Sequence, residues 1–212
     1  MTMVKSISFK TKQEGERAIP DELVRDVIDG EAFYYKGYRD VLNKTKTIEE
    51  LMGCSTLQGE IIMYLNYLLT QALGIIDFRI YTGEIGIHLS KKINYGLDLV
   101  VFDSHVLSSG KIDSHYANVP PHLVVEVDVK VDTQQLTEAE FIEKKTTSLL
   151  KHGTGKVIWI STKSKKVLIA EPGRAWQEQN WHEPFELLSG IRANVGEYLK
   201  MKGVPAGLDA VE

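Results

Sequence analysis

The sequence of 212 residues contains one cysteine, Cys54, and this scarcity sets the first limits on the protein. A single cysteine cannot form a disulfide within the chain, and low cysteine usage is typical of a reducing compartment. Residues 1–15 alternate polar and charged side chains without the apolar core of a signal peptide. No stretch approaches the ~20 apolar residues that span a bilayer. These absences predict a cytoplasmic protein with no membrane partner.

An excess of basic residues is also missing. The chain has 25 Lys and Arg residues against 29 Asp and Glu residues, which gives a net charge of −4. Proteins that bind nucleic acid over their whole surface are usually basic. Any nucleic-acid contact must therefore use a local basic patch. The content of 43% hydrophobic and 25% charged residues is that of a globular protein with a sizeable core.

Several enzyme motifs are absent or incomplete. No Gly-x-Ser-x-Gly elbow is present to expose a serine nucleophile, and residues 83–86 lack the Lys-Ser/Thr ending of a phosphate-binding loop. The triplet Asp-Ser-His occurs at 103–105 and again at 113–115. Without cysteine or tightly spaced ligands, a polar loop explains these triplets better than a zinc site. A hydrolase that uses His105 or His115 remains an alternative hypothesis.

Apolar periodicity predicts two main helices and a series of strands. One helix covers residues 56–73 with Gly74 at its end, and the other covers 137–152. Shorter helices are expected within 43–52 and at 194–201. A hairpin is expected to turn at Asp29-Gly30. Further strands are expected at 75–81, 84–89 (after a turn at Thr82-Gly83), 97–102, 122–131, 156–161 and 167–171, with a loop at 103–118.

This order of elements predicts a layered α/β or α+β fold. We expect one domain over residues 21–203. A polar segment at 1–20 precedes it, and a loose tail at 204–212 follows it.

The expected strand at 122–131 alternates apolar and charged side chains. One face would carry Leu123, Val125, Val127, Val129 and Val131, and the other Val124, Glu126, Asp128 and Lys130. A half-exposed strand gives the same pattern. However, Pro120-Pro121 precedes the strand, and the adjacent Val124 and Val125 are both apolar. These features favour a strand that is buried at its start and charged at its end, at the rim of a sheet, where functional sites are common.

Asp98 precedes a run of four apolar residues, 99–102. A carboxylate buried in such a strand without a partner costs several kcal/mol. An aspartate that bonds to a turn at the start of the strand is one explanation. The other is a cation beside it, and Mg²⁺ is the natural candidate because it takes a few carboxylate oxygens and keeps its waters.

Lys145 faces inward on the second helix. With Phe141 placed at zero and an advance of about 100° per residue, Lys145 falls at about 40°, inside the apolar arc, whereas Lys144 falls outside it. Such a lysine either extends along the surface to water or meets an acidic partner. On the first helix, Glu60 flanks the buried face. It could contact a metal or water, although a solvated glutamate is the simpler interpretation.

Two acids on neighbouring strands and one inward lysine form a set suited to hydrolysis. The acids Asp98 and Glu126 would hold a divalent metal, which lowers the pKa of a bound water. Lys145 would orient that water or offset charge on a phosphate. Lys130, on the same predicted face as Glu126, is a second candidate for the lysine's role.

These residues resemble the restriction-endonuclease-like superfamily with its PD-(D/E)xK signature, and more closely the Uma-two family of proposed endonucleases. The resemblance covers residues 28–199, and Asp29-Gly30-Glu31 matches an early hairpin of that family. Its clearest segments are 97–101, 121–127 and 143–145, with Gly153 and residues 157–160 after them.

The resemblance implies a restriction-endonuclease-like core, in which helices flank a central mixed sheet. It also implies Mg²⁺-dependent hydrolysis of phosphodiester bonds in DNA, with Mn²⁺ as a substitute. Asp98 matches the first acid, Glu126 the second, and Lys145 the lysine that the Uma-two family places on the following helix. The carbonyl of Val127 would assist the two acids as a metal ligand. Related nucleases commonly pair, so a homodimer is a further expectation.

The sequence departs from the family pattern in places. Leu97 replaces the usual proline before the first acid, and residues 129–131 replace an expected Ser-Pro-Ser segment, although Asp132 is retained. One residue is inserted between Gly153 and Trp159. These changes leave the acids and the lysine intact. They support a second hypothesis, a catalytically inactive protein of nuclease fold that acts in nucleic-acid or protein interaction.

Overall fold

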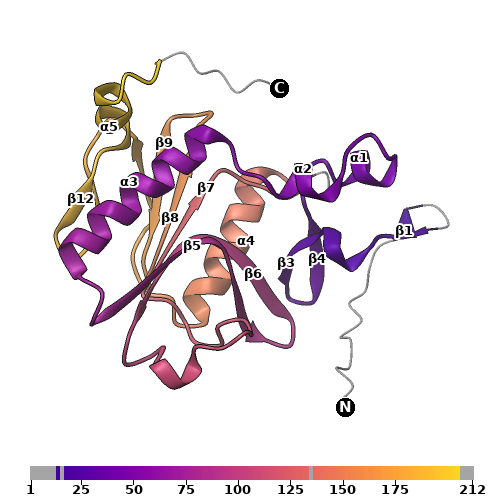
Figure 1. Ribbon diagram of the computed structural model, residues 1–212, viewed down its shortest axis with the longest axis horizontal. Helices are drawn as coiled ribbons and strands as arrows, with labels where there is room; N and C mark the ends of the chain where they lie inside the picture. Colours follow the sequence, from indigo (N-terminus) through magenta and orange to yellow (C-terminus); the bar gives the residue numbers. More distant parts are fainter. Residues whose placement is uncertain (1–12, 15–16, 134–135, 206–212) are drawn as a thin grey trace.

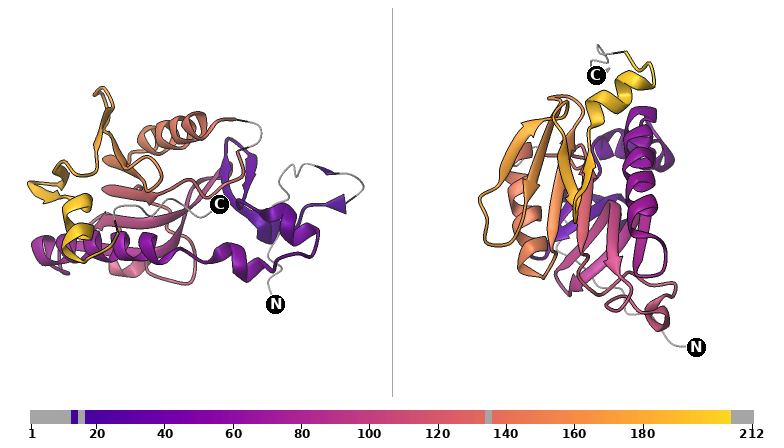
Figure 2. Two further views of the ribbon diagram at one scale, coloured as in Figure 1. Left: turned by 90° about the horizontal axis from the view of Figure 1, so that it is seen from above. Right: turned by 90° about the vertical axis from the view of Figure 1, so that its left-hand side faces the viewer.

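The computed structural model describes residues 13–14, 17–133 and 136–205. Most of the polar segment expected at 1–20 and of the tail expected at 204–212 lies outside these described residues. Within them, the α/β class is confirmed, because helices cover both faces of a large mixed sheet (Figures 1 and 2). None of the described helices is both long and apolar enough to cross a membrane.

The strands form one large sheet and two small pairs within the described ranges. The large sheet contains β3 (Val24–Ile28), β4 (Glu31–Tyr34), β5 (Phe78–Ser90), β6 (Ile93–Asp103), β7 (Leu123–Val127), β8 (Lys156–Ser161), β9 (Lys166–Ala170) and β10 (Gln177–Asn180). Its order is β10-β9-β8-β7-β6-β3-β4, and β5 also pairs with β6. The small pairs are β1 (Gln13–Glu14) with β2 (Arg17–Ala18), and β11 (Phe185–Leu188) with β12 (Ile191–Ala193). Only β7 and β8 pair in parallel among these described strands.

The helices begin and end largely where the sequence predicts. They are α1 (Tyr38–Leu42), α2 (Ile48–Met52), α3 (Thr56–Leu73), α4 (Glu138–Lys151) and α5 (Val195–Met201), with 3-10 turns η1 (Asp21–Leu23) and η2 (Ser109–Lys111). The Ser55 hydroxyl caps α3, and Gly74 ends it. Thr137 and Glu140 form a capping box at the start of α4. The short helix expected within 43–52 is α2, whereas α1, which ends just before that range, was not expected.

Several expected strand boundaries are wrong. The strand expected at 75–81 begins at Phe78, and the strand expected at 97–102 begins at Ile93. Thr82-Gly83 does not end a strand; β5 continues to Ser90, and its register with β6 shifts between Thr82 and Ile85 in a bulge. The strand expected at 122–131 ends at Val127, because Asp128 adopts a left-handed φ of 61°. The Asp128 carboxylate accepts hydrogen bonds from the backbone N–H and hydroxyl of Thr162, which hold this turn in place. The charged face predicted by alternation therefore stops at Glu126.

Apolar cores lie on both faces of the large sheet. On one face, α3 packs Ile61, Leu65 and Leu69 against β6, β7 and β8. On the other, α4 packs Phe141 and Leu149 against the same strands. All five residues of β7 are buried, so this strand contributes to both cores. A charged side chain on β7 is therefore enclosed by protein and needs partners of opposite charge.

Strand β6 organises the charged residues. It pairs with β3 where Asn94 meets Val27, and with β7 through residues 99–101. Along its other edge it pairs with β5, where His88 lies opposite Asn94. Strands β3 and β7 therefore follow one another along a single edge of β6. Asp98 lies between these two pairings, opposite the bulge in β5.

Candidate active site

Asp98 contacts residues from three separate parts of the chain. Its Oδ2 accepts hydrogen bonds from the backbone N–H of Val127 at 2.9 Å and from Nε2 of Gln58 at 3.1 Å. Its Oδ1 lies 2.7 Å from Nζ of Lys130. The carboxylate is buried, with 1% of the residue exposed. Its partners lie on α3, at the end of β7 and in the segment after β7, so the simple explanation by a local turn does not hold.

Glu126 and Lys145 form a buried ion pair between β7 and α4. The Lys145 Nζ lies 2.7 Å from Oε1 of Glu126 and 2.9 Å from Oδ2 of Asp26. All three residues are fully buried, so Lys145 does not extend to water. Among the described residues, neither Glu126 oxygen accepts a hydrogen bond of good geometry. The charge of Glu126 is therefore balanced by ion pairing alone.

Arg25 links the two predicted acids. Its Nη2 lies 3.4 Å from Oδ1 of Asp98 and 3.7 Å from Oε2 of Glu126. Its Nη1 lies 3.2 Å from Oδ2 of Asp26. The guanidinium is enclosed, since 2% of the side chain is exposed. Arg25 therefore provides positive charge between the carboxylates that the sequence assigns to a metal.

Arg25 and Asp26 were not predicted from the sequence. Both lie on β3, where they interrupt an otherwise apolar strand between Val24 and Val27. Besides its contacts with Lys145 and Arg25, Asp26 accepts a hydrogen bond from the backbone N–H of Gly96 at 3.0 Å. An Arg-Asp pair within an apolar strand is the signal that could have identified them, because such charges rarely lie inside a sheet without partners.

Helix α3 brings Gln58 to the cluster, not Glu60. Gln58 shares the buried face of α3 with Ile61 and Leu65, at spacings of three and four residues. A polar residue in that register could have been noticed in the sequence. Glu60 instead accepts a hydrogen bond from the Tyr198 hydroxyl. The structure therefore does not place the predicted Glu60 with the other acids.

Glu84 and Lys130 lie near Asp98 on the side that faces the pocket. Glu84, from the β5 bulge, lies 3.4 Å from Nζ of Lys130 and accepts a hydrogen bond from the Tyr35 hydroxyl at 2.9 Å. Lys130 is thus close to Asp98, although β7 has ended before it. Lys144 lies apart from the cluster and pairs with the exposed Glu31 at 2.8 Å. Of the lysines considered, Lys145 and Lys130 reach the acids.

Burial and neighbouring charges shift the pKa values of Glu126 and Arg25. Burial has the largest effect on Glu126 and raises its pKa to about 7. The positive charges of Lys145 and Arg25 oppose this rise, and the negative charges of Asp98 and Asp26 add to it. Desolvation alone would lower the pKa of Arg25, but the surrounding carboxylates raise it above its ordinary value. Arg25 is therefore a permanent cation, whereas Glu126 can hold a proton near neutral pH.

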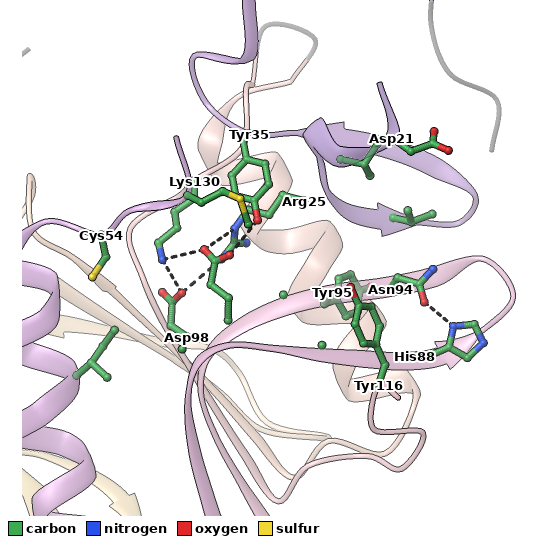
Figure 3. A pocket seen from close by; sticks show the side chains of 18 residues that line it. Asp21, Arg25, Tyr35, Cys54, His88, Asn94, Tyr95, Asp98, Tyr116 and Lys130 are labelled. Atoms are coloured by element: carbon green, nitrogen blue, oxygen red, sulfur yellow. Dashed lines mark hydrogen bonds and ion pairs between the residues drawn. The ribbon is translucent and has the colours of Figure 1, made fainter. Parts of the chain in front are cut away.

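A pocket of about 990 Å³ opens above the cluster. In Figure 3, Asp98, Lys130, Arg25 and Tyr35 lie on one side of it. Glu126 and Lys145 are not among the residues that line this pocket, so they lie behind Asp98 and Arg25. A ligand in the pocket would meet Asp98 and Lys130 first.

The described residues provide some, but not all, of the ligands expected around a metal ion. No group of three or more His, Cys, Asp or Glu side chains within the described ranges is arranged to hold a metal ion. Asp98 and Glu126 share Nη2 of Arg25 as a neighbour, and Glu126 has unused lone pairs. Two such carboxylates fit a hard divalent cation if the guanidinium moves aside. The Val127 carbonyl, expected to assist, remains a prediction.

The repeated Asp-Ser-His triplets have a structural explanation. The Asp103 carboxylate accepts a hydrogen bond from the backbone N–H of His105, and Asp113 accepts one from that of His115. These are turns in which an aspartate side chain bonds to the backbone two residues later. Neither histidine lines the pocket above the acids. The structure therefore gives no support to a hydrolase centred on them.

Comparison with known proteins agrees with this fold. No protein-family model and no curated protein matches the sequence. Among solved structures, the chain is similar to an Anabaena variabilis protein described as "a putative nuclease belonging to DUF820", with a TM-score of 0.63 and 11% identity. The match covers 84% of this chain and 91% of the other. At this identity the likeness shows a nuclease-like fold, not the activity.

Proposed function

We propose that this protein is a metal-dependent endonuclease related to the Uma-two family, which hydrolyses phosphodiester bonds in DNA. The observation that carries the proposal is the convergence of Asp98, Glu126 and Lys145 in one buried cluster beside a pocket. These residues come from β6, β7 and α4. They are the three that the sequence pattern singled out. The similarity to a nuclease-like fold supports the same assignment.

In this proposal, Asp98 and Glu126 hold Mg²⁺, with Mn²⁺ as a substitute. A divalent cation held by two carboxylates supplies a bound water of lowered pKa and positive charge for a phosphate. The buried Lys145 fixes the Glu126 carboxylate through their 2.7 Å contact. Lys130, which is partly exposed and lines the pocket, is placed to contact a phosphate oxygen.

The experiment is a cleavage assay with purified protein. Labelled single-stranded DNA, duplex DNA and RNA are incubated with Mg²⁺, with Mn²⁺ or with EDTA. We expect cleavage that requires the metal and is lost in Asp98→Asn and Glu126→Gln. Circular dichroism of each variant checks that it remains folded. Cleavage that persists in EDTA would refute the proposed chemistry.

A second function is favoured by one observation. Arg25, Lys130 and Lys145 already neutralise the acids without a metal. A protein that keeps the nuclease fold, but binds nucleic acid without cutting it, would need no further cation. The cleavage assay, combined with a binding measurement on the same labelled nucleic acids, separates the two functions. Binding of DNA without cleavage in any metal supports the second function and excludes the first.

A further inference from the structure

The pocket extends beyond the acidic cluster along the β5–β6 hairpin. In Figure 3, His88, Asn94 and Tyr116 lie at the end away from Asp98 and Lys130. Asn94 and Gly96 lie two residues apart on β6, so alternation places them on the same face of the strand. Both line the pocket that also contains Asp98. One strand thus connects the acidic end of the pocket to a second, less charged end.

Tyr116 provides a flat aromatic surface at this second end. Its ring lies against Gly86; a Cβ atom added at Gly86 would be only 2.3–2.7 Å from three ring carbons. Only a residue without a side chain allows this approach. Tyr116 as a whole residue is nevertheless 62% exposed. A ring supported by backbone on one side and open on the other is a platform on which a planar ligand can stack.

His88 and Asn94 provide hydrogen-bonding groups beside this platform. They are cross-strand partners, and Nδ1 of His88 donates to Oδ1 of Asn94. This contact requires the proton on Nδ1, so in the neutral ring Nε2 of His88 is an acceptor, and the Asn94 amide NH2 is a donor. Within the described chain, neither of these two groups has another hydrogen-bonding partner. Both side chains are half-buried and line the pocket.

We propose that the part of the pocket formed by His88, Asn94 and Tyr116 is a nucleobase site. The base would stack on Tyr116 and meet the donor and acceptor of Asn94 and His88 with its edge. A planar ring with mixed donors and acceptors along its edge is the chemistry of a nucleobase. The inference rests on the proposed nucleic-acid substrate but not on its cleavage.

This site also defines the form of the substrate. A base within a duplex is stacked between its neighbours, so it can reach a pocket only after unpairing. A strand that places a base on Tyr116 while its backbone passes Lys130 and Asp98 is therefore single-stranded or locally unpaired. The structure thus favours single-stranded ends, loops or opened regions over a regular duplex.

The test is equilibrium binding measured by fluorescence anisotropy. Labelled single-stranded oligonucleotides and duplexes of the same sequence are titrated in EDTA, and again in Ca²⁺, a hard cation that oxygen ligands also bind. We expect tighter binding of the single strand. Tyr116→Ala should weaken single-strand binding by about 5- to 100-fold, the range for loss of one base stack. Tyr67→Ala is the matched control, because Tyr67 is 58% exposed on α3 and lies outside the pocket.

Homopolymers supply a second readout. Asn94→Ala should change the ratio of affinities for oligo-dA and oligo-dT, because it removes a donor that meets the edge of the base. Equal single-strand binding by Tyr116→Ala and wild type, or tighter binding of the duplex, would overturn the nucleobase site. Cleavage without any effect of Tyr116 would retain the proposed function and discard this inference. Single-strand binding that depends on Tyr116, in a protein that does not cleave, would retain the nucleobase site and discard the proposed cleavage.

Discussion

The guanidinium of Arg25 lies 3.4 Å from the Asp98 carboxylate, in a region enclosed by protein. The same Nη2 atom approaches Glu126 at 3.7 Å. A divalent cation shared by these two carboxylates would occupy the neighbourhood of this nitrogen. Because two positive charges cannot share so small a buried volume without a large repulsion, the arginine and the metal compete for the acids.

Arg25→Met should therefore increase the affinity of the protein for Mn²⁺, measured by isothermal titration calorimetry. Without a metal, the variant should be less stable by about 3–5 kcal/mol, because removal of one partner leaves buried charge unbalanced. Mn²⁺ should restore most of this loss in a thermal unfolding experiment. Arg79→Met, at a residue that bonds to Leu107 and Ser109 on another part of the surface, is the control. Equal stabilisation of Arg25→Met and wild type by Mn²⁺ would contradict the competition.

The adjacent lysines of α4 should respond differently to substitution. Lys145→Met removes one of the two buried cations that pair with Asp26 and Glu126, so we expect a loss of about 3–5 kcal/mol in the free energy of unfolding and no cleavage. Lys144→Met removes only a surface pair with Glu31 and should change stability by about 0.5 kcal/mol or less. Urea unfolding measures both. Similar losses in the two variants would show that the burial of Lys145 is not what matters.

Stability should depend on pH through Glu126. The pKa of this group is raised from its ordinary value of 4.5 to about 7, so the folded protein holds a proton that the unfolded chain releases in this range. The free energy of unfolding should therefore decrease as pH rises from 4.5 to 7, by up to about 3 kcal/mol. Glu126→Gln should remove this slope in urea titrations in EDTA. Glu60→Gln should not, because the Tyr198 hydroxyl lowers the pKa of Glu60.

Metal binding should depend on the same proton. If a cation binds the ionised Glu126 carboxylate, binding near pH 6 must release a proton, and affinity must rise between pH 6 and pH 8. Calorimetry in buffers of different ionisation enthalpy counts the released protons. A pH-independent affinity would mean that the cation binds elsewhere.

Substitution of Gln58 should lower the metal affinity more than substitution of Glu60. Gln58→Leu removes a hydrogen bond that orients Asp98, and we expect metal affinity to fall by about 10- to 100-fold. Glu60→Gln, on the same helix but bonded to Tyr198, should leave metal affinity unchanged. Titration with Mn²⁺ measures both variants. An equal effect of the two substitutions would indicate damage to α3 rather than loss of one hydrogen bond.

The sequence predicted the positions of the helices better than the points at which strands end or bulge. The apolar periodicity of α3 and α4, together with Gly74 after α3, located both helices, because these signals depend on neighbouring residues. The end of β7 could not be located in this way. Its position depends on Asp128 bonding to Thr162 across the fold, a contact that alternation of side chains does not encode. The bulge in β5 was likewise mistaken for a turn at Thr82-Gly83.

The same distinction applies to the candidate site. Asp98 and Lys145 were conspicuous because each is a charge in an apolar pattern. The sequence does not single out Arg25 and Asp26, because an Arg-Asp pair in sequence resembles an ordinary surface dipeptide. Glu60 was considered because carboxylates are expected at metal centres, whereas helical spacing places Gln58 on the buried face.

The arrangement of β3 and β7 along one edge of β6 has a kinetic consequence. No short segment of the chain contains the whole cluster, because β3, α3, β6, β7 and α4 each supply part of it. Contacts between residues so distant in sequence form slowly, since long loops must first close. A growing polypeptide therefore has no assembled centre until Lys145 has been synthesised and α4 has docked. Whatever chemistry this protein performs begins only when the folding of these elements is complete.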